Sequence, residues 1–350
     1  MSFKLKVNQV RRDIMHGLTQ NLGSSSKVRA IGGKKIEIKR ILISRPNSRL
    51  GNQILITPLI QEVSDTFPEC KIDLFVRGYV AEIIFENYKN VDRIIKLPKK
   101  PFKDLGKYIK VWFSLRKYNY DIVINVDKVS SSGRLSTLIS NGKIKFFCDS
   151  YNDLEVRYND YLHIAKFPVY NLRSYLTQLG YKETNKPVPP LDLKLSSAER
   201  TKGKEVLDSL VSNTKKTIAI YTFATGTKCY SVEWWMEVYG RLKSEFGKEY
   251  NILEVLPVEN VSQIGFDAPS YYSKDLREIA AVIASTELFL GADSGMMHLA
   301  SSALTPVVGL FSVTSVDKYQ PYGANSVAIH TDTAGVEDII HAISKILMPL

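Results

Sequence analysis

The chain has 350 residues, 44% of them hydrophobic and 24% charged, with a formal net charge of +11. This composition is typical of a globular protein and excludes a disordered or fibrous chain, while the length favours two domains. The sequence shows no apolar run long enough to span a membrane and no secretory leader, and Cys70, Cys148 and Cys229 match neither a disulfide framework nor a metal motif. We therefore expect a cytoplasmic protein.

The excess positive charge gathers in residues 1–40 and 96–117. A phosphorylated substrate or an anionic membrane surface would explain it, whereas no nucleic-acid-binding signature is present and no nucleic-acid partner is expected. We expect residues 1–35 to form a basic N-terminal extension. Residues 96–117 also carry aromatic and aliphatic side chains, so they predict either a basic helix at a membrane interface or a solvated helix packed on the core.

From residue 40 onward, strand-like and helix-like segments alternate. The strands expected in the first half are 40–45, 71–77, 93–97, 120–126 and 143–147, with helices at 51–67, 79–87, within 96–117 and at 131–140. Residues 181–191, rich in proline and polar residues, form the best linker candidate. Beyond it we expect helices at 196–211, 232–246, from 276, from 295 and at 335–350, and strands at 217–222, 251–256, 287–292 and ending near 311.

Such alternation predicts an α/β protein with parallel sheets. The economical arrangement is two Rossmann-like domains, 36–185 and 186–350, that face each other across a cleft. Open sheets of this kind bind ligands at the carboxyl ends of their strands, so the loops that follow strands are the candidate binding sites.

A turn of Asp293, Ser294 and Gly295 follows the strand 287–292 and precedes a helix that carries His298. A helix start presents unpaired N–H groups and the positive end of the helix dipole, which favours a phosphate group. Ser294 can cap this helix, and Gly295 lets the backbone approach a ligand closely. A capped turn with a structural histidine is the alternative interpretation.

The loop after the strand 217–222 is rich in hydroxyl groups and precedes another helix. It contains Thr222, Thr225, Thr227 and Lys228, which together suit a phosphate, although the Gly-Lys-Ser/Thr order of a Walker A motif is absent. The loop after the first strand contains Arg45, Arg49, Gly51 and Asn52. No Gly-x-Gly-x-x-Gly follows that strand, which argues against a nicotinamide-dependent oxidoreductase.

The segment GADSGMMHLASSALTPVVGLF resembles the signature of glycosyltransferase family nine, the heptosyltransferases of lipopolysaccharide cores, which reads Asp-Ser/Thr-Gly-x-x-His-Leu-Ala-x-Ala-Leu-x-x-Pro. TGTKCYSVEWW is similar to that family's Lys-x-Trp-Pro-x-x-x-Trp, with Lys228 and Trp235 in place but Tyr230 and Ser231 instead of Trp-Pro. The segment from 42 to 76 is similar to the family's N-terminal strand, Gly-Asp turn and helix. The resemblance covers residues 40–347.

The resemblance implies the two-domain glycosyltransferase B fold and an inverting transfer without a metal or cofactor. The co-substrate would be a nucleoside-diphosphate sugar, typically ADP-heptose, held by the C-terminal domain. By matching position, Lys228 would meet the diphosphate, and the Asp293–Gly295 turn would bind sugar and phosphates with His298 nearby. Glu259 would contact the ribose.

The chain departs from the family where Asn52 replaces the aspartate of the Gly-Asp turn, the family's proposed base. A carboxamide cannot accept a proton at neutral pH. Asp127 follows the strand 120–126, so we hypothesise that Asp127 is the base and that Asn52 orients the acceptor. We expect Arg45, Arg49, Gly51 and Arg134 on the acceptor side.

Two hypotheses about function follow. The first is a sugar transferase that acts on a lipid-linked or phosphorylated saccharide, such as a lipopolysaccharide core, in the cytoplasm with peripheral contact to the inner membrane face. The second, suggested by the missing Gly-Asp carboxylate, is a catalytically impaired homologue that binds a nucleotide sugar and acts as a binding or assembly protein.

Overall fold

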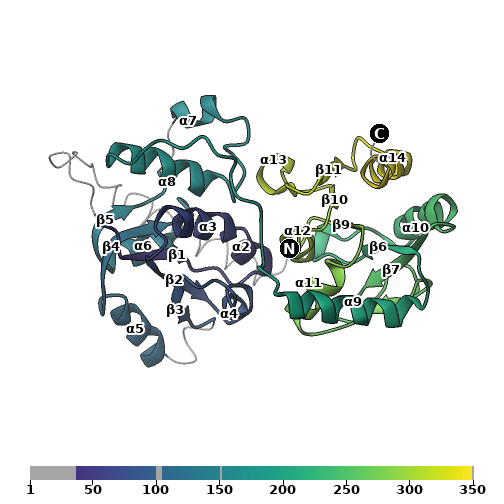
Figure 1. The fold of residues 1–350 in the computed structure, drawn as a ribbon, viewed down its shortest axis with the longest axis horizontal. Helices are drawn as coiled ribbons and strands as arrows, with labels where there is room; N and C mark the ends of the chain where they lie inside the picture. Colours follow the sequence, from purple (N-terminus) through teal and green to yellow (C-terminus); the bar gives the residue numbers. More distant parts are fainter. Residues whose placement is uncertain (1–36, 100–104, 150–151, 349–350) are drawn as a thin grey trace, which may run out of the picture. The chain divides into compact units, whose positions relative to one another are not determined.

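A computed structural model describes residues 37–99, 105–149 and 152–348 (Figure 1). The expected N-terminal extension, residues 1–35, lies outside the described residues, as do residues 100–104 of the basic and aromatic segment 96–117. The chain divides into two compact units. One contains the residues up to Ser48 together with Pro58–Pro189, and the other contains Arg49–Thr57 together with Pro190–Leu350.

The first unit is built on a five-stranded, fully parallel sheet with the strand order β3-β2-β1-β4-β5. Its strands are β1 (Arg40–Arg45), β2 (Lys71–Arg77), β3 (Val91–Leu97), β4 (Asn119–Asn125) and β5 (Asn141–Phe146). β1, β2 and β4 are buried along nearly their whole length, as continuous Ile, Leu and Val runs predict for a sheet covered on both faces. The strands expected from the sequence are confirmed to within two residues.

Helices connect these strands, and one expected helix is wrong in its extent. The helices are α2 (Leu50–Ile54), α3 (Thr57–Thr66), α4 (Val80–Ile84), α5 (Leu105–Ser114), α6 (Ser131–Ile139), α7 (Asn152–Arg157) and α8 (Phe167–Gln178). The sequence predicted a single helix over 51–67, whereas a turn at Leu55 and Ile56 separates α2 from α3. Pro58 explains the break, because it has no N–H to donate and is tolerated only in the first turn of a helix.

The sequence pattern did not predict α7 and α8. The buried positions of α8 include Tyr170, Asn171 and Arg173, so its hydrophobic period is weak. The Arg173 guanidinium donates to both carboxylate oxygens of Glu62 on α3, at 2.8 and 2.7 Å. Paired polar groups therefore replace part of the apolar face that identifies a helix in the sequence.

The second unit contains a six-stranded parallel sheet with the order β11-β10-β9-β6-β7-β8. Its strands are β6 (Lys216–Tyr221), β7 (Tyr250–Val255), β8 (Ser270–Tyr271), β9 (Leu288–Ala292), β10 (Val307–Phe311) and β11 (Val327–His330). Numbered within the unit, this order is 3-2-1-4-5-6, which is the order of dinucleotide-binding sheets. The order reverses between β6 and β9, and sheets of this kind bind ligands at the carboxyl ends of the strands at such a reversal.

The helices of this unit follow the expected pattern. They are α9 (Ser197–Val211), α10 (Val232–Phe246), α11 (Leu276–Ile283), α12 (Gly295–Ser302), α13 (Val316–Tyr319) and α14 (Val336–Leu347). The short elements β8, α13 and β11 were not predicted, since two to four residues carry too little periodicity. Trp235 on α10 and Ile339 and Ile343 on α14 are fully buried in one cluster against β6, β9 and β10. Among the described helices, none is long and apolar enough to cross a membrane.

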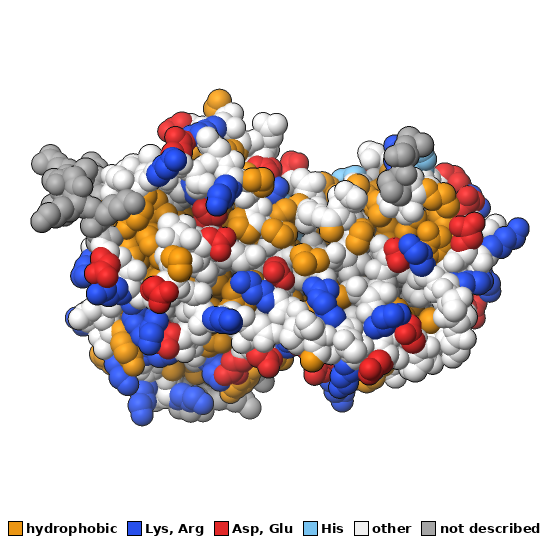
Figure 2. Space-filling view, viewed as in Figure 1, with side chains coloured by type: hydrophobic (Ala, Val, Ile, Leu, Met, Phe, Trp, Pro, Cys, Tyr) orange, Lys and Arg blue, Asp and Glu red, His pale blue; other side chains and the backbone are white. Residues whose placement is uncertain are grey.

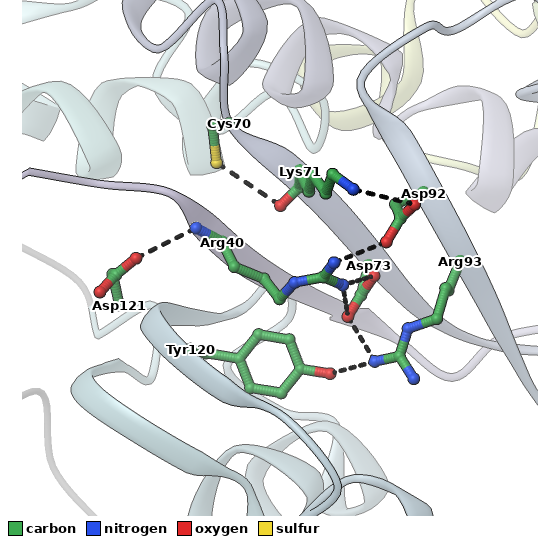
Figure 3. Close-up of polar contacts among 8 residues, drawn as sticks. All are labelled: Arg40, Cys70, Lys71, Asp73, Asp92, Arg93, Tyr120 and Asp121. Atoms are coloured by element: carbon green, nitrogen blue, oxygen red, sulfur yellow. Dashed lines mark hydrogen bonds and ion pairs between the residues drawn. The ribbon is translucent and has the colours of Figure 1, made fainter.

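A charged cluster closes the amino-terminal edge of the first sheet (Figure 3). The carboxylate of Asp73 is fully buried, and it accepts hydrogen bonds from Arg40 at 2.9 Å and from Arg93 at 2.5 Å. Arg93 also donates a hydrogen bond to the hydroxyl oxygen of Tyr120, at 3.0 Å, and Arg40 pairs with Asp92 at 2.7 Å. The cluster lies at the opposite ends of the strands from the candidate binding loops, which indicates a structural role.

Candidate functional site

The Asp293–Gly295 turn connects β9 to α12 at the point where the strand order of the second sheet reverses. The N–H of Asp293 donates to the carbonyl of Leu310 on β10, at 2.9 Å, which fixes the turn on the sheet. The Ser294 hydroxyl caps α12 by accepting a hydrogen bond from the N–H of Met297, at 3.3 Å. The turn therefore ends in a capped helix start, the local structure that suits a phosphate group.

Lys228 brings a cation to this turn. It lies in the loop after β6, and its Nζ donates to Oδ2 of Asp293 at 2.5 Å. The Asp293 side chain is nearly buried, whereas about a third of the Lys228 side chain remains exposed. Because an ammonium group has three donors and the structure commits one of them to Asp293, Lys228 can still bind an anion beside α12.

Thr314 completes the group, and sequence reasoning missed it. Its hydroxyl donates to the same Oδ2 of Asp293, at 2.5 Å, from the loop that follows β10. The cluster thus gathers the ends of β6, β9 and β10, which are neighbours in the sheet order but far apart in the sequence. A hydroxyl-rich run from Ser312 to Ser315 was the one available signal.

His298 lies in the same cluster, with its Nε2 3.9 Å from Oδ1 of Asp293, a distance too long for a hydrogen bond. Its ring is packed against Gly51 of α2, where an added Cβ would lie 2.7 Å from Cδ2 of the ring. An added Cβ on Gly295 would lie 3.1 Å from Cβ of Leu50. Glycines at both positions therefore let α2 approach the first turn of α12, and Gly51 has a packing role there.

The other residues expected at the donor site divide into buried and exposed sets. Thr222 is buried, and its hydroxyl donates to Oε1 of Glu254 at 2.6 Å and accepts from the N–H of Gln263 at 3.2 Å. Thr225 and Thr227 are exposed beside Lys228. Thr222 thus holds the loop in place, while the other two threonines offer hydroxyl groups to solvent.

Glu254 is a second residue that the sequence pattern did not reveal. It is fully buried at the carboxyl end of β7, where burial raises the pKa of its carboxyl group, opposed by the hydrogen bonds of Thr222 and Ser262. Glu259, expected near the ribose, is exposed. Burial raises the pKa of Tyr221, and the negative charge of Glu259 raises it further. Tyr221 is the last residue of β6, so Glu259 is near enough to the carboxyl end of this strand to interact with it electrostatically.

The first unit has its own reversal of strand order, between β1 and β4. The buried Arg45 guanidinium donates to Oδ2 of Asp127, which follows β4, and Oδ1 of Asp127 accepts from the N–H of Val129 at 3.2 Å. Arg134 on α6 is also buried and lies 3.6 Å from Asp149. Two guanidinium groups, each with a carboxylate partner, thus lie after the strands of this sheet.

Arg49 and Asn52, the remaining predicted residues, belong to Arg49–Thr57 of the second unit. Arg49 is exposed and precedes α2, and Asn52 is half-buried on α2. The predicted base Asp127 belongs to the first unit, so the two residues of the hypothesis lie on different units. Within the part of the chain that the structure describes, no three His, Cys, Asp or Glu side chains are grouped as a metal site.

Comparison with known proteins identifies the region that contains Asp293, His298 and Thr314 of this cluster, but not Lys228. Residues 273–338, which include the Asp293–Gly295 turn and Thr314, match the model of Glycosyltransferase family 9 (heptosyltransferase). Over these residues the chain is similar to glycosyltransferase family 9. It is 22% identical to lipopolysaccharide heptosyltransferase 3 of Escherichia coli over 301 residues, which cover 79% of this chain and 85% of the relative. It is 26% identical to lipopolysaccharide heptosyltransferase 1 of Campylobacter coli over 294 residues, covering 76% and 82%.

Solved structures extend the likeness to the whole fold. A glycosyl transferase family 9 protein from Veillonella parvula matches with a TM-score of 0.70 at 18% identity, over 91% of this chain and 99% of the other. The E. coli heptosyltransferase WaaC with ADP matches with a TM-score of 0.64 at 17% identity, over 88% and 99%. The prediction of two Rossmann-like domains with the glycosyltransferase B fold is confirmed.

The structure also explains one departure of this chain from the Lys-x-Trp-Pro pattern that the resemblance leads one to expect. Ser231 caps α10 by accepting a hydrogen bond from the N–H of Trp234, at 3.3 Å. Tyr230 stacks on Trp234 with ring centroids 4.2 Å apart, and its hydroxyl lies 2.8 Å from that of Thr331. Serine and tyrosine thus start and pack the helix by other means than proline and tryptophan.

Proposed function

We propose that this protein transfers a sugar, a heptose or a similar one, from a nucleoside-diphosphate sugar to a lipopolysaccharide core or another cell-surface glycan. The observation that carries the proposal is the ion pair of Lys228 and Asp293 at the first turn of α12. It lies at the reversal point of a sheet with the dinucleotide-binding order. ADP is the preferred nucleotide, because the structurally similar heptosyltransferase WaaC is described with ADP.

The proposed reaction breaks the bond between the anomeric carbon and the diphosphate oxygen and forms a bond to the acceptor oxygen. The electron pair leaves with the diphosphate, and Lys228 together with the positive end of α12 stabilises the charge that develops there. Asp293, which also accepts a hydrogen bond from Thr314, holds the Lys228 ammonium group in position. The threonine hydroxyls of the loop, Thr225 and Thr227, contribute further donors for the phosphates.

The acceptor hydroxyl must lose its proton as the new bond forms. We assign this proton to Asp127, which Arg45 and the N–H of Val129 orient after β4, and we assign to Asn52 the role of orienting the acceptor. Of the three arginines expected on the acceptor side, Arg49 is exposed and suits a phosphate group, whereas Arg45 and Arg134 are buried beside Asp127 and Asp149. Loss of a general base typically lowers the rate by about 10²- to 10⁴-fold. Asp127→Asn should therefore lower kcat by this amount without weakening nucleotide binding. The control is Asp153→Asn, which changes an exposed carboxylate on α7 and should retain kcat.

Nucleotide binding tests the proposal most directly. Thermal unfolding with ADP, GDP or UDP should show the largest increase in Tm for ADP, because a ligand that binds only the folded chain stabilises it. Lys228→Met should remove most of this increase, and Lys248→Met, which changes an exposed lysine on a turn, should leave it intact. An equal increase in the wild type and in Lys228→Met would contradict the proposed diphosphate site.

A second candidate is a protein that binds the nucleotide sugar without transferring it efficiently and acts in binding or assembly. The observation that favours it is Asn52, which stands where the family pattern has a carboxylate. The two candidates differ in turnover. Release of ADP from an ADP-sugar in the presence of a membrane glycolipid extract supports transfer, whereas nucleotide binding without release supports the second candidate.

A further inference from the structure

Helix α5 packs on the first sheet with one face only. Tyr108, Val111 and Trp112 contact a buried cluster that includes Phe75 of β2, and the rings of Phe75 and Trp112 lie 5.3 Å apart. This contact explains the aromatic residues of the helix. It leaves three further apolar residues of α5, which lie beside this packed face, without an explanation.

Leu105, Ile109 and Phe113 form a stripe on the solvent side of α5. Their side chains are 54%, 46% and 69% exposed, and none of the residues of α5 is fully buried. Because they are spaced four residues apart, they lie within about 80° of one another around the helix. The apolar arc of α5 is therefore much wider than the face that the core covers. Three large exposed apolar side chains in one row differ from the single ones that any protein surface carries.

Positive charge borders this stripe. Lys107 and Lys110 are exposed on α5, and Arg116 and Lys117 are exposed just beyond it. No Asp or Glu occurs from Leu105 to Tyr120. In Figure 2, apolar side chains adjoin basic ones at the lower left, where Figure 1 draws α5.

We infer that the solvent face of α5 docks on the surface of an anionic phospholipid bilayer. The stripe Leu105, Ile109 and Phe113 enters the boundary between headgroups and acyl chains, and Lys107 and Lys110 meet the lipid phosphates. The charge pattern favours a bilayer over a protein groove, because a long row of positive charge without an acidic residue matches a surface of uniform negative charge. Long lysine side chains can also extend along the helix toward the headgroups while the apolar stripe is buried.

This inference extends the proposed function, because a lipid-linked acceptor would be presented at such a surface. It can be tested without any sugar transfer. Sedimentation of the full chain with vesicles of phosphatidylglycerol and phosphatidylethanolamine should show binding, and vesicles of phosphatidylcholine alone should bind much less. Added salt should weaken the binding, because it screens the lysines from the lipid phosphates.

Two sets of variants separate the stripe from the charges. Replacing Leu105, Ile109 and Phe113 together by serine, or Lys107 and Lys110 together by glutamate, should each lower vesicle binding by about tenfold or more. The matched controls change other exposed residues of the same unit: Val156→Ser with Leu162→Ser, and Lys89→Glu with Lys182→Glu. These controls should bind vesicles like the wild type.

The outcomes distinguish this inference from the proposed function. The α5 variants should keep the increase in Tm that ADP gives the wild type, which also shows that they fold. If the protein binds vesicles but ADP does not raise its Tm, the inference about α5 stands and the proposed nucleotide site is contradicted. Equal vesicle binding by the α5 variants and the wild type would overturn the inference, as would equal binding to phosphatidylcholine. Loss of a dimer in the serine variant, with unchanged vesicle binding, would instead assign the stripe to contact between two copies.

Discussion

At the scale of single residues, Asp73 shows how one side chain can hold several strands. Its carboxylate is fully buried between Arg40 and Arg93, which come from the two strands on either side of β2. Burial acts to lower the pKa values of both guanidinium groups, but hydrogen bonds to carboxylates outweigh it: those to Asp92 and Asp73 raise the pKa of Arg40, and that to Asp73 raises the pKa of Arg93. Removal of this carboxylate would leave Arg93 without the carboxylate that it pairs with, and Arg40 with the partly exposed Asp92.

We therefore expect Asp73→Asn to lower the free energy of unfolding by about 3 kcal/mol, as for other broken buried ion pairs. Asp92→Asn is the matched control, since Asp92 pairs with the same Arg40 but is a third exposed. Its cost should be at most about 1 kcal/mol. Urea unfolding measures both, and similar losses for the two variants would refute the central role of Asp73.

The lowered pKa of Glu199 leads to a prediction about how the free energy of unfolding depends on pH. Hydrogen bonds from Arg277, opposed by burial and aided by Ser196, lower the pKa of Glu199 from 4.5 to about 2. A carboxylate with a lowered pKa stabilises the fold above pH 4.5, and this contribution is lost as the pH falls toward 2. Glu199→Gln should therefore cost about 1 to 2 kcal/mol at neutral pH and progressively less below about pH 4.5. Glu205→Gln, on the exposed face of α9, should show no such pH dependence in the same unfolding titration.

The sequence singled out the residues of the second unit's cluster in part. Lys228 and Asp293 were recognised because each follows a strand and carries a charge in a motif. Thr314 and Glu254 were missed, because serines and threonines are common in loops and one acidic residue within the strand of residues 250–255 gives no local signal. Their positions become evident only when the strand order brings the ends of β6, β7, β9 and β10 together.

At the scale of elements, close packing of α9 and α11 depends on a glycine. A Cβ at Gly203 would lie 2.3 Å from the backbone carbon of Ala281, so no side chain fits there. Gly240 lies inside α10, and a Cβ there would meet nothing within 4 Å. Two glycines in helix interiors thus have opposite surroundings.

Gly203→Ala should destabilise the protein by about 1 to 3 kcal/mol, because α9 and α11 must move apart. Gly240→Ala should stabilise it by about 0.5 to 1 kcal/mol, since alanine favours the helix and finds open space. Thermal unfolding of both variants checks the pair. A stabilising Gly203→Ala would show that the two helices are not in close contact.

Long helices and buried strands were predictable from the sequence because each has a clear period and flanking turn residues. The helix α10 was predicted at Val232–Phe246, where the structure places it. The division at Leu55 and Ile56 and the helix α8 were not predictable in the same way. In the first case one proline decides the break, and in the second a buried salt bridge substitutes for apolar residues.

At the scale of the whole molecule, the chain does not divide cleanly at its linker. The segment Arg49–Thr57 follows the first strand of the first sheet but belongs to the second unit. The hydrophobic periodicity of the sequence cannot reveal that this segment belongs to the second unit, because it shows only that a helix follows β1. The contact that carries it, between Gly51 and His298, depends on the tertiary fold.

A protease site introduced at 182–185 tests this organisation. After cleavage, the two pieces should elute together under native conditions, because the N-terminal piece still carries the segment that packs on α12. The same cleavage in Gly51→Trp should let the pieces separate, since the indole has no room beside His298. Size-exclusion chromatography gives the readout, and separate elution of the pieces with glycine at this position would contradict the prediction.

The assignment of Arg49–Thr57 to the second unit affects how chimeras of this protein should be designed. An exchange of only the residues after 190 between relatives would combine a foreign α12 with the original Arg49–Thr57. The close packing of Gly51 against the ring of His298 would then not be preserved by design. Recombination with relatives should therefore transplant residues 49–57 along with the C-terminal half.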